Sequence, residues 1–586
     1  MITAPYNFVP LNKEVFYPSW ADDISHDVPF EDGESGEIDI TITAKSPIFI
    51  RNHSDDKDNQ SKEFCHHNNL KYIPGSSLKG VIKTIVEIIG FSKLKLQDKT
   101  LSYRDLNHPS YKTKAMDGDK IYMGWLFKNS NNDWIIENLG KVTNGQTRIK
   151  YDEMKEYLSE NIVRDIKSKK EAYKKYELVK FEQLKIEKGT IVFTGSTGNK
   201  TREFLFPNIN PIETFTFDKN HKIIQTFHEA YYIGTPNESK DWKNLWKKRF
   251  DNGNRIPVFF QLDNENNLKH FGLSMLYKLP YEYSLQNILE KYQNINTSKD
   301  LAETLFGYVE ENDALKGRVL FSHLKCIKEI KYNKKVTLPL SSPRATFYPN
   351  YLVQCQENGK TQKFITYDRL DAILRGFKMY PPKKNIIEIA KNEKGENFCD
   401  KNAKICTSFE PLGINTTFNG KIKFHNLKAI ELGALLCALN FINQNKDNKY
   451  FHKIGMAKSY GFGTVSIDIN SIKTSNNLSI NDYTKIFIDY INKEFNINLL
   501  EHPRIKALFK LSSYSFEDKD LKIMDIKDFV NAKKDFNKFC LEEAVENGYD
   551  KSKICKKQNE NKSSQTKTDK KEVKSSTDLS SFFKNR

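Results

Sequence analysis

Residues 37–45 of the chain read Glu-Ile-Asp-Ile-Thr-Ile-Thr-Ala-Lys, which alternates apolar and polar side chains. This alternation predicts a strand with one buried face. Residues 72–90 follow a polar loop and begin Tyr-Ile-Pro-Gly-Ser-Ser-Leu-Lys-Gly. The Pro-Gly pair predicts a turn, Ser76 or Ser77 can cap a helix, and apolar residues then recur at helical spacing. Strand, loop and capped helix make half of a split β-α-β unit.

The second half of such a unit lies far along the chain. Residues 316–323 and 419–427 each predict a strand. Residues 430–439 predict a helix, and residues 464–469 alternate as a further strand. With the first half, these pieces follow the order β-α-β-β-α-β of a ferredoxin-like fold. The predicted fold class is therefore α+β, with an RRM-like core.

The rest of the chain predicts insertions and terminal regions. Residues from about 91 to 300 carry strands and charged helical stretches of their own, and a second insertion runs from about 331 to 411. The expected parts are an N-terminal segment (1–35), a core with both insertions (36–470), a helical C-terminal region (471–554) and a tail (555–586). The tail is basic and almost free of apolar residues, so we expect it to be disordered.

Composition narrows the class of protein. The 586 residues carry 92 Lys and Arg against 75 Asp and Glu, a net charge of +17, which favours a polyanionic partner. No apolar run is long enough to span a membrane, so we expect a cytoplasmic protein without membrane contact. The 8 cysteines are scattered with no regular framework, which predicts reduced thiols and no disulfides.

Residues 455–465 are the most informative segment and read Gly-Met-Ala-Lys-Ser-Tyr-Gly-Phe-Gly-Thr-Val. Glycines allow the backbone to approach a phosphate closely, exposed amides can bind its oxygens, and Lys458 adds positive charge. A glycine-rich turn before a strand is in most proteins only a turn. The segment gains meaning from the motifs that accompany it.

The combination of three motifs resembles the RAMP superfamily of CRISPR-associated proteins. They are Ile-Pro-Gly-Ser-Ser-Leu-Lys-Gly at 73–80, Leu-Phe-Gly at 305–307 before a Gly-Arg-Val-Leu-Phe strand, and the glycine-rich loop at 455–463. The chain is most similar to the backbone subunits of type III effector complexes, in a large single-chain subfamily. The resemblance implies a prokaryotic antiviral protein that binds guide RNA (crRNA), with target RNA and other type III effector subunits as further partners.

The resemblance also implies which residues contact RNA. Ser76, Ser77 and Lys79 would bind guide phosphates at the start of a helix, where free amides and the helix dipole favour an anion. The same serines would serve equally well as helix caps, with Lys79 in solvent. In the glycine-rich loop the corresponding residues are Gly455, Lys458, Ser459, Gly461 and Gly463. Arg344 lies where basic and aromatic residues interleave, so it could contact RNA or form a surface turn.

An alternative function is that of an endoribonuclease. Target-cleaving relatives carry an acidic residue in the loop between the first strand and helix, and here that loop holds Asp55, Asp56 and Asp58. Carboxylates there could hold Mg²⁺ at a scissile phosphate. The loop departs from the family pattern, and the alternative is that its carboxylates are only solvated, as in most such loops. Processing of precursor crRNA by His53, His66 or His67 is a further alternative. No resident metal site is expected, since Cys65 and the adjacent histidines lack zinc-ligand spacing.

Overall fold

The fold of the chain is mixed α and β, as the sequence predicts. The computed structural model describes residues 3–53, 62–96, 98–103, 111, 121–143, 146–195, 200–231, 241–332, 334–340, 345–355, 364–389, 397–402, 405–444, 447, 449–476, 478–524, 528, 541–552, 554 and 555. No helix within these ranges is long and apolar enough to cross a membrane. The predicted disorder of the tail falls on residues outside them, apart from Cys555.

The chain forms two compact units. The first comprises residues 1–97 and 286–558, and the second comprises residues 98–285 together with 559–586, the latter outside the described ranges. The bounds that the sequence predicts for core and insertions remain a prediction.

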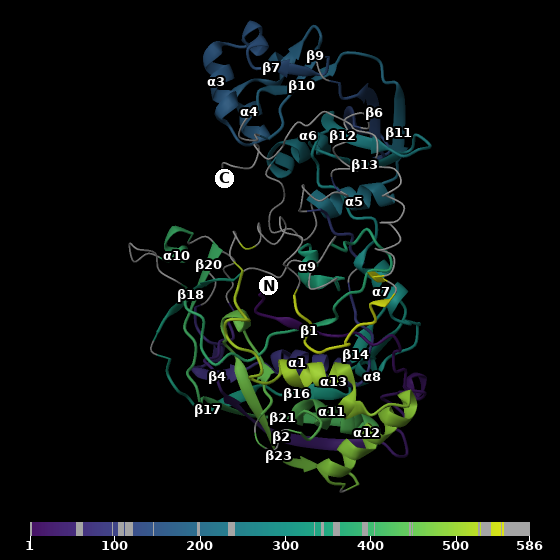
Figure 1. Cartoon of the computed structure of the whole chain (residues 1–586), viewed down its shortest axis with the longest axis vertical. Coiled ribbons are helices and arrows are strands. Elements are labelled where there is room, and N and C mark those ends of the chain that lie inside the picture. Colours follow the sequence, from purple (N-terminus) through teal and green to yellow (C-terminus); the bar gives the residue numbers. More distant parts are fainter. Residues whose placement is uncertain are drawn as a thin grey trace. The chain divides into compact units, whose positions relative to one another are not determined.

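A sheet in which eight of the described strands pair forms the centre of the first unit (Figure 1). β2 (Glu34–Ala44) lies between β23 (Thr464–Lys473) and β21 (Thr417–Leu427), antiparallel to both. β21 also pairs with β16 (Val319–Phe321) and β17 (Leu324–Lys328). The remaining strands of the sheet are β3 (His66–His67), β4 (Leu70–Ile73) and β22 (His452–Lys453).

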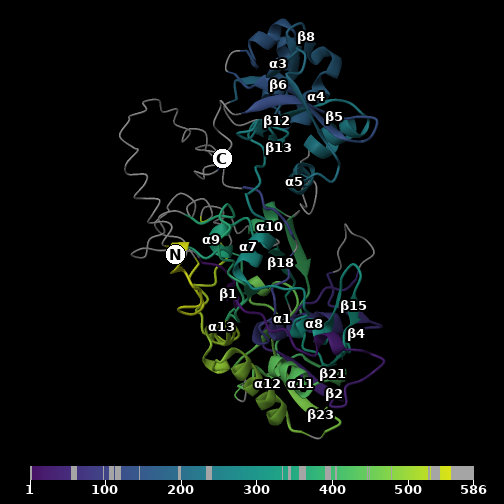
Figure 2. The same ribbon diagram turned by 90° about the vertical axis from the view of Figure 1, so that its right-hand side faces the viewer.

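Alternation along β2 separates the two faces of this sheet. Ile38, Ile40 and Ile42 are buried, whereas Glu37 and Asp39, which alternate with them, are partly exposed. Helices α1 (Gly75–Ile89) and α11 (Ala429–Asn440) pack against each other and against strands of the sheet, on the apolar face (Figure 2). The period-two pattern of the sequence therefore places a polar face on the other side.

Helix α1 begins earlier than the capping prediction assumed. Its predicted apolar stripe is buried, but the residue at its N-cap is Pro74, and no side chain caps the helix. Ser76 and Ser77 thus lie inside the first turn, and the expectation that one of them caps the helix is wrong. Proline suits this position because its fixed φ and missing N–H leave no unsatisfied donor.

Helix α11 is apolar all round because other elements pack against it from more than one direction. Its residues from Ile430 to Leu439 are all buried, and it contacts the sheet, α1 and α12 (Ile480–Phe495). A helix that is hydrophobic all round is expected only in such an enclosed position.

A buried ion pair joins the helices to the sheet. The Arg318 guanidinium binds the Glu431 carboxylate at the start of α11, and both side chains are fully buried. Arg318 also donates to the Thr304 carbonyl at 3.0 Å and to the Asn426 carbonyl. Because every donor group of this arginine faces an acceptor, the pair is the kind that a low-dielectric interior tolerates.

Short elements complete the first unit. The strands pair as β1 (Asn7–Val9) with β19 (Phe377–Met379), β14 (Gly307–Val309) with β15 (Ala314–Lys316), and β18 (Val336–Pro339) with β20 (Cys406–Phe409). The helices are α7 (Leu285–Tyr292), α8 (Leu301–Phe306), α9 (Tyr348–Tyr351), α10 (Phe398–Lys401) and α13 (Pro503–Leu511). α7 begins at the last residue of the second unit.

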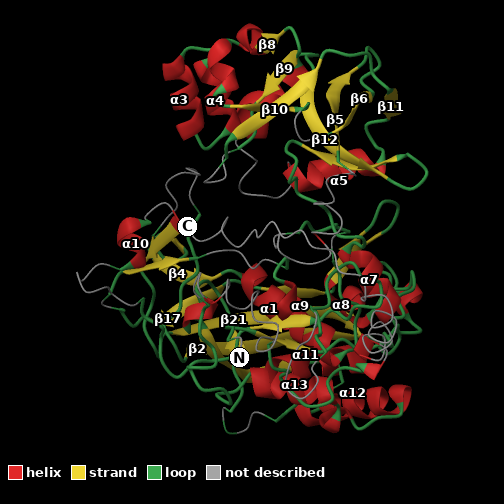
Figure 3. Ribbon diagram, turned by 45° about the horizontal axis from the view of Figure 1, so that its top comes forward, coloured by secondary structure: helices red, strands yellow, loops and turns green. Residues whose placement is uncertain are grey.

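The second unit contains two antiparallel sheets and four described helices (Figure 3). One sheet has the order β7 (Arg148–Lys150), β10 (Arg202–Pro207), β9 (Gly189–Val192) and β8 (Lys185–Ile186). The other has the order β11 (Glu213–Phe217), β6 (Trp134–Lys141), β5 (Tyr122–Lys128), β12 (Ile256–Leu262) and β13 (Leu268–Gly272). The helices are α3 (Glu160–Ser168), α4 (Ala172–Leu178), α5 (Lys222–Tyr231) and α6 (Lys247–Asp251).

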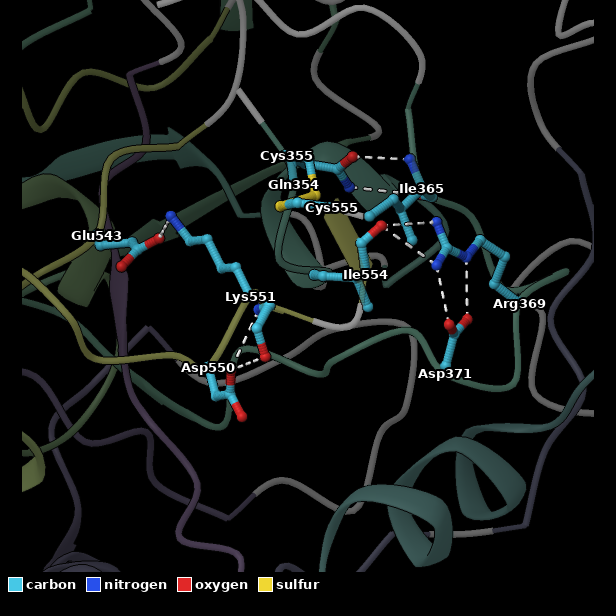
Figure 4. The surroundings of a disulfide bond; sticks show 11 residues. Gln354, Cys355, Ile365, Arg369, Asp371, Glu543, Asp550, Lys551, Ile554 and Cys555 are labelled. Atoms are coloured by element: carbon cyan, nitrogen blue, oxygen red, sulfur yellow. Dashed lines mark hydrogen bonds and ion pairs between the residues drawn. A yellow bond between two sulfur atoms is a disulfide. The ribbon is translucent and has the colours of Figure 1, made fainter. Parts of the chain in front are cut away.

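Two disulfides correct the prediction that all cysteines are reduced. Cys355 pairs with Cys555, and Cys399 pairs with Cys406. The first bond joins residues 200 positions apart, and Arg375 holds the same parts of the chain together by donating to the Leu541 carbonyl and accepting from the Tyr549 hydroxyl. Beside it, Arg369 donates to the Ile554 carbonyl at 3.3 and 3.4 Å while Asp371 holds the same guanidinium (Figure 4). The spacing of the cysteines in the sequence does not indicate this contact.

Candidate nucleic-acid interface

The start of helix α1 is built on a close backbone contact. A side chain at Gly75 would place its Cβ 2.2 Å from the Phe321 carbonyl oxygen, so only glycine allows the helix to begin against β16. The Gly75 N–H donates to Nδ1 of His323 at 3.2 Å. The first turn of the helix is therefore fixed at the edge of the sheet.

The predicted contact residues of α1 differ in their surroundings. Ser76 is exposed and Ser77 partly so, and within the described part of the chain neither hydroxyl has a hydrogen-bond partner. Lys79 instead donates to the Phe306 carbonyl at 3.2 Å, and burial followed by the charge of Lys83 lowers its pKa. The two hydroxyls are thus available to a ligand, whereas the lysine already has one protein contact.

The glycine-rich loop owes its shape to its glycines. Gly455, Gly461 and Gly463 have φ values of +87°, +102° and +74°, in the left-handed region. A Cβ at Gly463 would lie 1.9 Å from the Ile454 carbonyl oxygen. The N–H of Gly463 donates to Pro47 at 2.8 Å, so this amide is turned toward the protein and not toward a ligand.

Three lysines gather under this loop, of which the sequence singled out only Lys458. Lys453 donates to the Gly461 carbonyl at 3.2 Å and to the Thr464 hydroxyl at 2.9 Å. Lys383 is buried and donates to the Leu521 carbonyl. We refer to Lys383, Lys453 and Lys458 as the lysine cluster.

Burial lowers the pKa of every member of the lysine cluster, and repulsion by the other two members adds to this effect at Lys453. Burial lowers the pKa of Lys453 well below its usual range, and the charges of Lys383 and Lys458 lower it further. Burial brings the pKa of Lys383 to about 8, although Asp518 opposes the change, and burial lowers the pKa of Lys458. No carboxylate within the described ranges forms an ion pair with any of the three.

Asp518, the carboxylate that acts on the pKa of Lys383, forms hydrogen bonds with other residues. Asp518 accepts hydrogen bonds from the backbone N–H groups of Lys384 and Asn385 at 3.1 and 3.0 Å. Unpaired buried charge is costly, and an anion that reaches the cluster relieves both the desolvation and the repulsion. The chemistry of the site thus favours a phosphate or another multiply charged anion.

Several predicted site residues cannot be placed. Asp55, Asp56, Asp58 and Arg344 lie outside the described residues. His66 lies in β3, 3.7 Å from the Glu63 carboxylate. Among the described side chains, no group of three or more His, Cys, Asp and Glu could hold a metal ion.

Sequence reasoning missed Lys383 and Lys453. Lys383 stands in an ordinary Pro-Pro-Lys-Lys run 75 positions before Lys458, and nothing in that run indicates burial. Lys453 is five residues before Lys458, so its closeness to the loop was a usable, weak signal.

Comparison with known proteins assigns the family. Residues 41–466 match the family model of the RAMP superfamily, and the chain therefore belongs to that superfamily. No curated protein matches the chain.

Two solved structures are similar to the chain at low identity. Csc2 of Thermofilum pendens is 11% identical, with 86% of this chain and 93% of that chain covered and a TM-score of 0.23. A chain of a CRISPR RNA-guided surveillance complex in a pre-nicking state is 9% identical, with 78% and 89% covered and a TM-score of 0.20.

Proposed function

We propose that this chain binds guide crRNA as a backbone subunit of a type III CRISPR effector complex. The observation that carries the proposal is the lysine cluster at the glycine-rich loop, whose three lysines form no ion pair with any carboxylate of the described residues. The hydroxyls of Ser76 and Ser77, which have no hydrogen-bond partner among the described residues, add a second point of contact at the start of α1. Membership of the RAMP superfamily supports the same function.

The proposal extends to fold, partners and place of action. The strand order β23-β2-β21-β17 supports a ferredoxin-like core, because a β-α-β-β-α-β chain places its fourth, first, third and second strands in that order. Target RNA and other effector subunits are the proposed partners, and the proposed location is the cytoplasm. In this proposal Lys458 and Ser459 contact phosphate, while Gly455, Gly461 and Gly463 maintain the loop conformation.

Binding of RNA tests the proposal. We expect Lys458→Met and Lys453→Met each to weaken binding of crRNA about 10- to 100-fold, the effect of losing one charge-assisted contact. The slope of log affinity against log salt should fall by about 0.7 per lost contact with single-stranded RNA. Lys79→Ala should also weaken binding, since it removes a positive charge from the start of α1, where Ser76 and Ser77 lie.

Lys485→Met is the matched control, because it removes the same charge from an exposed position of α12. It should leave affinity and salt slope unchanged. Equal affinities and slopes in all of these variants would remove the lysine cluster from the RNA path. Absence of RNA binding by the unmodified chain, alone and with its effector partners, would refute the proposed function itself.

A further inference from the structure

A hollow lies on the polar face of the eight-stranded sheet. Its volume is about 550 Å³, within the range of about 300–1,000 Å³ that is common for ligand sites. Strands β2, β16, β17, β21 and β23 and the turn after β16 line it. Its walls combine the apolar side chain of Leu320, which is 57% exposed, with the amides of Asn419 and Asn470. We call this hollow the sheet groove.

The charge of the sheet groove is positive after ion pairs are considered. Glu37 and Asp39 on this face both bind Lys421, at 2.8 and 3.3 Å, so their charge is largely neutralised. Lys325 and Lys423 also line the groove and are exposed. Within the described ranges, neither of these two lysines has an ion-pair partner.

His323 connects the sheet groove to the start of α1. Its Nδ1 accepts the hydrogen bond from the Gly75 N–H at 3.2 Å, so the neutral ring carries its proton on Nε2. The ring is exposed, lines the groove, and lies 4.8 Å from the ring of Tyr72 at an angle of 36°. One side chain thus offers a ring surface and an N–H donor directly beside the turn that carries Ser76 and Ser77.

We propose that the sheet groove holds a segment of single-stranded RNA that continues from the start of α1. This inference rests on the proposed function and adds a second contact region to it. Lys325 and Lys423 bind phosphates, and a base stacks on His323 beside Leu320. The Asn419 Oδ1 accepts from the Thr41 hydroxyl at 2.9 Å, so Asn419 presents its amide N–H groups to a base edge, whereas Asn470 is bonded to the same hydroxyl. Stacking requires an unpaired base with a free face, which selects a single strand over a duplex.

Binding of RNAs of two lengths tests this proposal. We expect an oligonucleotide of about 4 nucleotides to occupy only the lysine cluster, and one of about 12 nucleotides to occupy the groove as well. We expect Lys325→Ala/Lys423→Ala to leave the affinity for the short RNA unchanged. For the longer RNA the double variant should lower the salt slope by about 1.4, the value for two phosphate contacts with a single strand.

The matched control is Lys473→Ala. Lys473 lies on neighbouring β23 and binds Glu37 at 3.2 Å, but it does not line the groove. It should behave as the unmodified chain with both RNAs. His323→Gln keeps an acceptor for the Gly75 N–H and removes the ring, so it should weaken binding of the longer RNA without loosening α1.

Photocrosslinking locates the base. RNA that carries 4-thiouridine should crosslink to the tryptic peptide 319–325, which contains His323, and His323→Gln should reduce the yield. If the double variant and the unmodified chain bind the longer RNA with equal slopes and no crosslink forms in this peptide, the groove does not hold RNA. In that case, an acidic peptide that binds the unmodified chain at the sheet groove would identify a protein partner instead. Failure of the unmodified chain to bind either RNA would refute both this proposal and the proposed function.

Discussion

Replacement of Lys383 by methionine tests the electrostatics of the lysine cluster. The pKa of Lys383 is about 8, against an ordinary value of 10.5, and the side chain is 2% exposed. The unfolded chain therefore binds more protons than the folded chain between these two pH values. At pH 7 the charged lysine destabilises the folded state by about 3 kcal/mol. The substitution removes this cost, but it also removes the hydrogen bond to Leu521, which lowers the gain in the free energy of unfolding by about 1–3 kcal/mol.

We therefore predict that Lys383→Met, although it replaces a buried residue, does not destabilise the protein at pH 7. Stability of the unmodified chain should rise with pH from about 8 to 10.5, because a group with a lowered folded pKa ceases to oppose folding as it loses its proton. The difference in free energy of unfolding between Lys383→Met and the unmodified chain should shrink by about 2 kcal/mol between pH 8 and pH 10. Only this difference is informative, since tyrosines also titrate in that range.

Urea unfolding at several pH values, followed by circular dichroism, measures this difference. Lys485→Met serves as the control, and its difference from the unmodified chain should not change with pH. A loss of several kcal/mol at pH 7 in Lys383→Met, independent of pH, would show that Lys383 is an ordinary structural residue. It would refute the reasoning that the cluster lacks a neutralising partner.

Three further predictions concern other parts of the chain. Truncation after Cys555 should leave the melting temperature unchanged. Truncation after Ile554 removes the disulfide with Cys355 and should lower the free energy of unfolding by up to about 5 kcal/mol, and reduction by dithiothreitol should have the same effect. Arg318→Met should destabilise the chain by about 3–5 kcal/mol by leaving Glu431 buried and unpaired, while Arg318→Met/Glu431→Met should cost less in the same urea assay. Replacement of the three loop aspartates (Asp55, Asp56 and Asp58) with asparagine should abolish any Mg²⁺-dependent cleavage of complementary RNA and preserve guide binding; cleavage by the triple variant would exclude the loop.

The sequence correctly predicted the features that depend on the spacing of apolar residues within one strand or helix. The strand over 37–45 and the apolar stripe of the helix after Pro74 were correct because alternation and helical spacing record which side of an element is buried. The expected cap at Ser76 or Ser77 was wrong by two or three residues, since Pro74 can start the same helix. Element boundaries depend on a few backbone angles that several residues satisfy equally well.

The sequence could not predict contacts between distant segments. Cys355 and Cys555 meet only because a C-terminal segment crosses back over the first unit. Lys383 is buried because it packs beside the loop, and the pairing of β22 with β23 brings Lys453 to the same place. His323 stands at the end of a predicted strand, yet its link to Gly75 depends on how α1 meets β16. Charge and burial of single residues are properties of the assembled fold.

The choice of lysine in the cluster suits a subunit that binds a polyanion. An arginine keeps its charge at every physiological pH, so three buried arginines would oppose folding whenever RNA is absent. A lysine can release its proton in the free chain and regain it when a phosphate approaches. With a pKa of about 8, Lys383 is half protonated near pH 8, so RNA binding there should take up protons from the buffer. If the chain binds RNA as proposed, the lysine cluster therefore opposes folding only in part without RNA and gains charge when RNA binds.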